Sequence, residues 1–257
     1  MFDFVVENLS VHLAAVRAAV SNARLSLDEE SVHRLRVSIR RLTEALRSLD
    51  DWVEPRRAAK LQRRLRPIMK AAGAVRDFDM ARRLCLKAPT QSAATAELLA
   101  IERTEATHHL LKKLLALDLD KLHPPCWPNP ALPAPRALAA SIVADLIPRY
   151  WQSDPNAADL HPLRLATKHL RYTLELFAPF YGRGAGAKLD LLRRLQTHLG
   201  DIADCNAALR FDIVKRDGQL CEWLAGRRKS ARRKFIEIWA RTRPSGEAWA
   251  RYFARGR

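Results

Sequence analysis

Apolar residues recur along this chain at intervals of three and four positions, the spacing of a helix that buries one face. In the first such stretch the apolar positions are Leu35, Ile39, Leu42, Leu46 and Leu49. The same spacing returns at residues 60–72 and 189–199. No stretch alternates between apolar and polar residues for long enough to indicate a strand. The pattern therefore predicts an all-α fold.

Each half of the chain contains one series of these helices. The predicted helices are residues 5–22, 33–50, 60–72 and 96–117 in the first half, and residues 137–151, 161–179, 189–199 and 220–241 in the second. The third helix of each series is followed by a glycine, an aspartate and another helical turn. Each half is therefore expected to form a helical bundle.

The second series repeats the first. At a shift of 128 residues the matching pairs in the second helices are His33 with His161, Leu35 with Leu163, Arg36 with Arg164, and Arg40 with Lys168. Further on, GAVRDFDMA at residues 73–81 resembles GDIADCNAA at residues 200–208, at a shift of 127. This indicates duplication of a unit of about 125 residues.

A proline-rich connector separates the two copies. Residues 123–135, HPPCWPNPALPAP, hold six prolines and are predicted to form a semi-rigid extended spacer. The first repeat is then residues 1–122 and the second is residues 136–257. We expect the repeats to face each other across a pseudo-twofold axis, because the matching sequences would then form one shared surface.

The net charge of the chain limits the classes of ligand that it is expected to bind. Forty-five Lys and Arg residues against 28 Asp and Glu give a formal net charge of +17. A charge of this size attracts polyanions: nucleic acid, an acidic membrane surface, an acidic protein or inorganic polyphosphate. Most of these cations are arginine, whose planar fork of donors suits phosphate oxygens.

The cellular compartment is predicted from three absences in the sequence. The four cysteines, Cys85, Cys126, Cys205 and Cys221, lie far apart and are expected to be reduced. The opening MFDFVVENLS has no secretory signal, and eighteen apolar residues nowhere run together, which argues against a membrane span. We expect a soluble cytoplasmic protein that does not bind membranes, and the oligomeric state stays open.

The basic residues of the two second helices line up on one side of each helix. At 100° per residue, the stripes consist of His33, Arg36, Arg40 and Arg47 in the first copy, and His161, Arg164, Lys168 and Arg171 in the second. Such a stripe is either a solvated face or an anion-binding surface. Like charges one turn apart destabilise a helix, yet both copies keep them, which favours the anion-binding surface.

Further arginines occur on the last predicted helices. Arg103 and Arg228 each stand seven and eleven residues before apolar positions, which predicts that they lie on the apolar side of their helices. A cation there needs a partner or a wet cavity. Either both arginines pair with Asp or Glu across the bundle, or they line an inner surface with the stripes, together with Arg232.

Metal-dependent chemistry is not indicated. Asp77 and Asp79 would point about 200° apart on a helix, so Asp77 and its match Asp204 are predicted to form structural salt bridges with arginines. The sequence has no P-loop, HExxH or GxSxG motif, and its histidines lack the spacing of metal ligands. We expect no catalytic residue, no metal and no cofactor.

The His-x-x-Arg-x-x-x-Arg-Arg-Leu run from His33, its copy from His161 and the Gly-x-x-Arg-Asp and Gly-x-x-x-Asp turns resemble the CHAD family, the conserved histidine α-helical domain. The resemblance implies two four-helix bundles related by a pseudo-twofold axis, with a basic cavity that binds inorganic polyphosphate, and association with polyphosphate granules. The ligand-facing positions that it implies are His33, Arg36, Arg40, Arg41, His161, Arg164, Lys168 and His169. The ExExK motif of the catalytic triphosphate-tunnel module that adjoins many relatives is absent.

Non-enzymatic binding of polyphosphate is therefore the first hypothesis, and binding of single-stranded nucleic acid is the alternative. Single-strand binders present aromatic side chains to the bases, and only Tyr172 lies on the cationic faces. Hydrolysis of phosphoanhydrides lacks a metal-binding set of carboxylates. The predicted binding residues are His33, Arg36, Arg40, Arg41, Arg47, Arg103, His161, Arg164, Lys168, His169, Arg171, Arg228 and Arg232.

Overall fold

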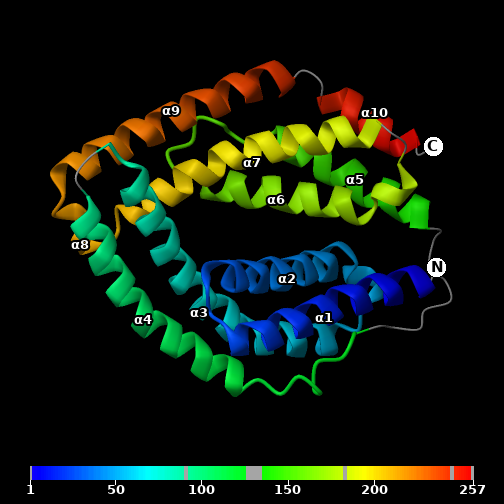
Figure 1. The fold of residues 1–257 in the computed structure, drawn as a ribbon. Helices are drawn as coiled ribbons and strands as arrows, with labels where there is room; N and C mark the ends of the chain where they lie inside the picture. Colours follow the sequence, from blue (N-terminus) through cyan, green and yellow to red (C-terminus); the bar gives the residue numbers. More distant parts are fainter. Residues whose placement is uncertain (1, 90–91, 126–134, 182–183, 244–245, 256–257) are drawn as a thin grey trace. The chain divides into compact units, whose positions relative to one another are not determined.

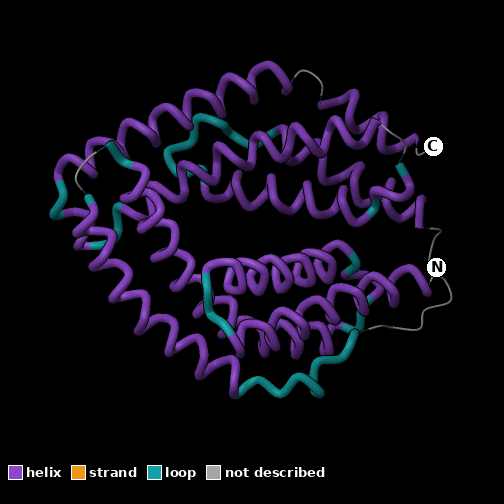
Figure 2. The backbone as a smooth tube through the Cα atoms, viewed as in Figure 1, coloured by secondary structure: helices purple, strands orange, loops and turns teal. Residues whose placement is uncertain are grey.

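The computed structural model describes residues 2–89, 92–125, 135–181, 184–243 and 246–255, and in these ranges it contains helices and no strand (Figures 1 and 2). The α-helices are α1 (Phe2–Leu25), α2 (Glu29–Ser48), α3 (Pro55–Lys87), α4 (Ala93–Leu115), α5 (Pro135–Trp151), α6 (His161–Leu176), α7 (Gly184–Ala208), α8 (Asp212–Lys215), α9 (Gly218–Thr242) and α10 (Gly246–Arg255). Two short 3-10 helices, η1 (Asp50–Trp52) and η2 (Ala178–Phe180), follow α2 and α6. The all-α prediction is confirmed.

The chain forms two compact units that interleave in sequence. The amino-terminal unit comprises Phe2–Pro130 and Asp204–Leu224, and the carboxy-terminal unit comprises Ala131–Ala203 and Ala225–Arg257. Both α7 and α9 therefore contribute residues to each unit. These units divide the chain differently from the predicted repeats, residues 1–122 and 136–257, which remain a prediction from sequence. Most of the predicted connector, residues 126–134, lies outside the described residues.

In the amino-terminal unit, α1 packs against α2 and α4, α2 packs against α3, and α3 packs against α4 (Figure 1). The start of α2 is fixed by Asp28, whose carboxylate accepts a hydrogen bond from the Ser31 backbone N–H at 2.7 Å. The apolar face predicted for α2 is buried at Leu35, Ile39, Leu42, Leu46 and Leu49. Its packing leaves the basic residues on the other sides of the helix.

Helix α3 is longer than predicted. The sequence suggested a helix at residues 60–72 and a glycine turn after it, whereas α3 continues unbroken through Gly73 to Lys87. Glycine inside a helix costs about 1 kcal/mol relative to alanine. Buried Ala72 and Val75, on either side of Gly73, hold the helix together at this point. Helix α7 passes through Gly200 in the same way.

The far end of the amino-terminal unit has a core made from distant parts of the chain. Residues from α3 and α4 pack with the end of α7, α8 and the start of α9, around Cys85, Cys205 and Val214. Asp217 accepts hydrogen bonds from the Ser92 and Thr95 hydroxyls at 2.8 and 3.2 Å. Burial raises the pKa of the Cys85 thiol to about 11, and Cys85, Cys205 and Cys221 are free thiols, as expected of reduced cysteines. Cys126 lies outside the described residues.

The carboxy-terminal unit has an aromatic core. Helix α5 packs against α6 and α10, and the ring of Trp151 lies 4.8 Å from that of Trp239 and 5.5 Å from that of Trp249, centroid to centroid. The sequence analysis missed α10, whose ten residues are too few for a clear three-and-four pattern. Gly246 starts this helix against Trp151: a Cβ at residue 246 would lie 2.7 Å from the indole Cδ1 atom.

By length and composition alone, residues 4–25 of α1 could cross a membrane, with a mean hydropathy of 1.2. The sequence analysis predicted no such span, because it counted only unbroken apolar runs. Within its unit α1 packs as a core helix, and Leu9, Val16 and Val20 are completely buried.

Candidate anion-binding site

The basic residues of α2 differ in how many partners they have. His33, Arg41 and Arg47 are exposed, and Arg36 and Arg40 are half-buried. Among the described residues, the Arg40, Arg41 and Arg47 side chains have no hydrogen-bond or ion-pair partner. Three guanidinium groups on one helix are therefore available to an external anion.

Arg36 lies against the backbone of α3. Its Nη1 atom would be 2.9 Å from a Cβ built at Gly73, closer than real Cβ contacts allow. The close approach is possible because glycine has no side chain. In the second copy nothing lies within 4 Å of the corresponding position at Gly200. Gly73 is thus a positioning residue for Arg36, and no equivalent contact exists at Gly200.

His33 sits in a strongly positive environment. Its pKa is lowered from the ordinary value, chiefly because the imidazole is partly desolvated. The positive charges of Arg76, Arg36 and Arg40 also disfavour the protonated imidazole, whereas the negative charge of Glu30 favours it. Arg76, on α3, was not among the predicted binding residues. Arg76 belongs to the motif Gly-x-x-Arg-Asp, but the matching position in the second repeat is Ala203. The match between the repeats therefore does not mark Arg76 as a binding residue.

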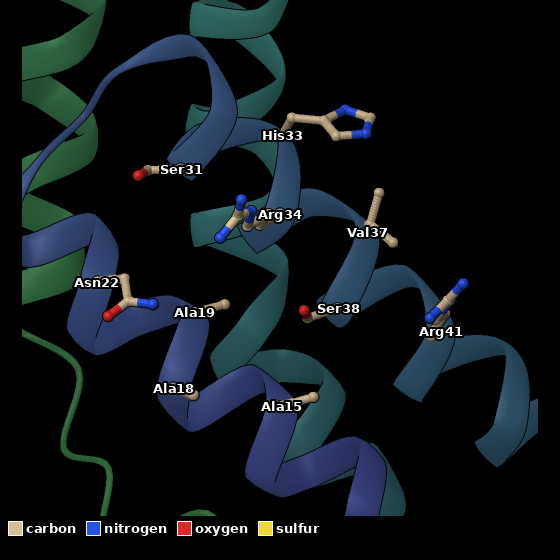
Figure 3. Close-up of a pocket in the computed structure, with 10 residues that line it drawn as sticks. All are labelled: Ala15, Ala18, Ala19, Asn22, Ser31, His33, Arg34, Val37, Ser38 and Arg41. Atoms are coloured by element: carbon tan, nitrogen blue, oxygen red, sulfur yellow. The ribbon is translucent and has the colours of Figure 1, made fainter.

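A shallow groove of about 470 Å³ lies between α1 and α2, and His33 is one of the residues that line it (Figure 3). Its lining comprises Ala15, Ala18, Ala19 and Asn22 of α1, and Ser31, His33, Arg34, Val37, Ser38 and Arg41 of α2. Small side chains on α1 leave this space. Near it, burial and the charge of Arg41 lower the pKa of His12. Cations of α2 therefore extend from the α3 side, at Arg36, to the α1 side, at Arg41.

The corresponding residues of α6 are more enclosed. His161 is exposed and Arg164 is half-buried, whereas Lys168, His169 and Arg171 are buried. The Arg171 guanidinium donates to Glu175 at 2.6 Å and to Gln196 at 2.7 Å, and lies 4.1 Å from the centre of the Tyr172 ring. Arg171 thus already has an anionic partner, and Tyr172 is covered on one face.

The three arginines predicted on the last helices of the two copies occupy different environments. Arg103 donates to Asp79 Oδ1 at 2.5 Å and to the Leu27 carbonyl at 2.9 Å. Arg232 donates to the carbonyls of Asn156 and Ala157 at 2.7 and 2.9 Å. These contacts match the structural alternative for Arg103 and give Arg232 a role in fixing a loop.

The sequence analysis placed Arg228 on the apolar side of its helix, and this prediction is wrong: the residue is exposed. The reason is that burial along α9 is interrupted between Leu224, in the core of one unit, and Ala231, in the other. Its neighbour Arg227 pairs with Asp201 at 2.8 Å instead. The regular spacing of apolar residues on either side concealed this break.

The acidic residues of the motifs also behave differently from one another. Asp77 is exposed, while Asp79 is buried and makes the ion pair with Arg103. The sequence analysis assigned the structural salt bridge to Asp77 and Asp204, and the structure has one at Asp79. Within the described part of the chain, no group of three or more His, Cys, Asp or Glu residues is arranged to hold a metal ion.

Fold and site together define an all-α protein of bundled helices, and on its second helix Arg40, Arg41 and Arg47 have no ion-pair partner within the described ranges. A family model for the CHAD domain matches residues 7–211. The chain therefore belongs to the CHAD domain family, as its motifs suggested.

Two solved structures resemble the whole fold. The crystal structure of the CHAD domain from the plant Ricinus communis matches with a TM-score of 0.67 at 21% identity, covering 100% of this chain and 92% of that one. The structure of PptA from Streptomyces chartreusis matches with a TM-score of 0.64 at 17% identity, covering 93% and 99%. At these identities the similarity concerns the fold. No curated protein sequence matches the chain.

Proposed function

We propose that this protein binds inorganic polyphosphate without hydrolysing it. The observation that carries the proposal is a set of guanidinium groups on α2, those of Arg40, Arg41 and Arg47, which have no partner in the described part of the chain and lie on the same helix as His33 and Arg36. Neighbouring phosphates along a polymer can each take one guanidinium, with charge-assisted hydrogen bonds that are stronger than neutral ones. The net charge of +17 adds a long-range attraction for a polyanion.

The sequence repeat and the family support a wider arrangement for this function. In our proposal the two repeats are related by a pseudo-twofold axis, and the cationic helices α2 and α6 line one basic cavity. The protein acts in the cytoplasm, at polyphosphate granules, and does not bind membranes. The buried Lys168 and the paired Arg171 make α6 the weaker of the two binding helices.

The aromatic residues favour polyphosphate over single-stranded nucleic acid. Bases need exposed aromatic rings on which to stack. Trp52, Trp151, Trp239 and Trp249 are buried, and Tyr172 is covered on one face by Arg171. The surface of α2 offers cations and hydroxyls but no Phe, Tyr or Trp ring among its described residues.

Competition between polymers tests the proposal. Labelled long-chain polyphosphate is bound to the protein at fixed salt and displaced by unlabelled polyphosphate or by single-stranded DNA of matched charge. We expect DNA to compete at least tenfold less well per phosphate, because the surface of α2 has no Phe, Tyr or Trp ring on which the DNA bases could stack. Equal competition per phosphate would reduce the function to general polyanion binding. Release of orthophosphate in the presence of Mg²⁺ would contradict a non-enzymatic role.

Substitution of Gly73 by alanine should weaken binding without unfolding the protein. The new Cβ displaces the flexible end of Arg36, and we expect affinity for polyphosphate to fall roughly fivefold, which corresponds to about 1 kcal/mol, the net value of an ordinary hydrogen bond. Gly200→Ala is the matched control, since its Cβ meets nothing within 4 Å. Both changes should raise thermal stability slightly. Equal affinities of the two variants would show that the Arg36 position is irrelevant to binding.

Polyphosphate should bind more tightly as the pH falls. The pKa of His33 is lowered in the free protein by burial and neighbouring arginines, which favours the neutral imidazole. A bound polyanion raises that pKa again, so binding takes up a proton, and affinity increases as the pH falls from about 7.5 to 5.5. Calorimetry in buffers of different ionisation enthalpy measures the proton directly. His33→Gln should abolish this uptake; uptake that persists in the variant would assign it to another group.

A further inference from the structure

A carboxylate lies within the cationic cluster at the start of α2. Glu29 Oε1 accepts a hydrogen bond from Arg76 Nη1 at 2.6 Å and another from Arg83 Nη2. Both arginines belong to α3 and are seven residues apart, or two helical turns. Arg76 also repels a proton on His33. One oxygen of Glu29 thus joins two guanidinium groups beside the predicted binding stripe.

We propose that Arg76 and Arg83 form an oxyanion subsite, that Glu29 fills it in the free protein, and that a phosphate group of the ligand replaces the Glu29 carboxylate there. The proposal rests on the polyphosphate-binding function and extends it from α2 to α3. Carboxylate and phosphate oxygens are interchangeable acceptors for the planar donor fork of arginine. A phosphate within a polymer brings further oxygens and neighbouring charges, which a single carboxylate lacks.

The burial of the three side chains permits such an exchange. Side-chain exposure is 41% for Glu29 and 44% for Arg83, so the carboxylate can turn out into water. Arg76 is only 16% exposed and keeps its place against the helix. A guanidinium group that is largely enclosed loses much of its hydration, and therefore an anion must remain beside it. The ligand phosphate meets this requirement when Glu29 leaves.

The position of Glu29 in α2 lowers the free-energy cost of its release. Glu29 is the first residue of the helix, where the positive end of the helix dipole stabilises a negative charge whether or not an arginine is bound. The cap itself is formed by the neighbouring Asp28, through its hydrogen bond to the Ser31 N–H. Helix α2 therefore keeps its start when Glu29 moves.

Glu30 provides the contrast. It pairs with Arg34, one turn along the same helix, at 2.7 Å, and both side chains are more than 60% exposed. A pair of this kind contributes little to stability, and Glu30 joins no second helix. Neutralising Glu29 or Glu30 changes the net charge of the protein by the same amount, so the two substitutions separate a local effect from a general one.

The test compares Glu29→Gln, Glu29→Asp and Glu30→Gln in the full chain, with affinity for long-chain polyphosphate measured at fixed salt. We expect Glu29→Gln to tighten binding roughly tenfold, the value of the two ion pairs no longer broken, and Glu30→Gln to tighten it less than threefold. Glu29→Asp keeps the charge but is too short to join both arginines, and should also tighten binding. In the Arg83→Gln background only the Arg76 pair remains, so the gain from Glu29→Gln should fall to about threefold, the value of one ion pair.

Equal effects of Glu29→Gln and Glu30→Gln would overturn the proposal, because only net charge would then matter. It would also fail if the full tenfold gain from Glu29→Gln survived removal of Arg83. Circular dichroism of each variant checks that the helix content is unchanged, and Glu29→Asp gives the answer if the glutamine variant folds poorly. If the wild-type chain does not bind polyphosphate at all, the proposed function itself is wrong; if it binds and these variants do not differ, only the subsite is wrong.

Discussion

Replacement of Arg40 and Arg47 by glutamine is expected to weaken polyphosphate binding about thirtyfold while leaving the fold intact. Each guanidinium makes a charge-assisted contact with phosphate, for which roughly 1 kcal/mol is a reasonable value at a surface position. Neither arginine has a hydrogen-bond or ion-pair partner among the described residues, so no contact within the protein is lost. The dependence of log affinity on log salt should become shallower by about 0.7 for each phosphate contact removed.

Lys112→Gln with Lys113→Gln is the matched control. These two residues are exposed in the last turn of α4, and their replacement removes the same two charges. We expect this variant to lose less than threefold in affinity, through the general attraction alone. Equal losses in both double variants would mean that polyphosphate samples the whole basic surface and that α2 has no special role. Filter binding at several salt concentrations measures both affinity and slope.

The second large effect concerns stability. Asp79→Ala should lower the free energy of unfolding by about 2 kcal/mol, because it leaves the Arg103 guanidinium half-buried without its anion. The side chain of Asp79 is 5% exposed and that of Arg103 is 22% exposed. The larger values known for completely buried pairs are reduced here by the partial access of water to Arg103. Urea denaturation followed by circular dichroism gives the change.

The comparison for this pair is Asp201→Ala, which removes the partner of Arg227. Both of those side chains are about one-third exposed, at 33% and 35%, so the loss should stay below about 1 kcal/mol. The Asp79 variant also tests whether Arg103 binds ligand, as the sequence analysis proposed. Unchanged affinity for polyphosphate in folded Asp79→Ala protein would make Arg103 a structural residue. A loss of affinity with unchanged stability would instead make it a binding residue.

The helices themselves were predictable because their cause is local. The apolar stripe of α2 is defined by residues three and four positions apart, and these residues are the buried ones. The length of α3 was not predictable in this way, because the packing of Ala72 and Val75 outweighs the preference of Gly73 for a turn. Membership of Asp204–Leu224 in the amino-terminal unit also depends on contacts far along the chain, which periodicity does not contain.

The candidate site was predictable where both copies share it, and at Arg47, whose counterpart is Glu175, from its place on the cationic stripe alone. His33, Arg36 and Arg40 were found because His161, Arg164 and Lys168 match them. Glu29 and Arg76 were missed because their counterparts in the second copy are Ala157 and Ala203. A helical wheel also shows in which direction a side chain points but not whether other helices bury it. It could therefore not distinguish the open side of α2 from the enclosed side of α6.

The way α7 and α9 contribute to both units has a consequence for dividing the chain. The core around Cys85 in the amino-terminal unit is completed by Cys205, Val214, Leu220 and Leu224, which lie beyond the proline-rich segment in the sequence. A polypeptide cut at that segment would leave this core without these residues. The first half of the chain, although it matches the second in sequence, therefore does not contain all of the core on which its own helices pack.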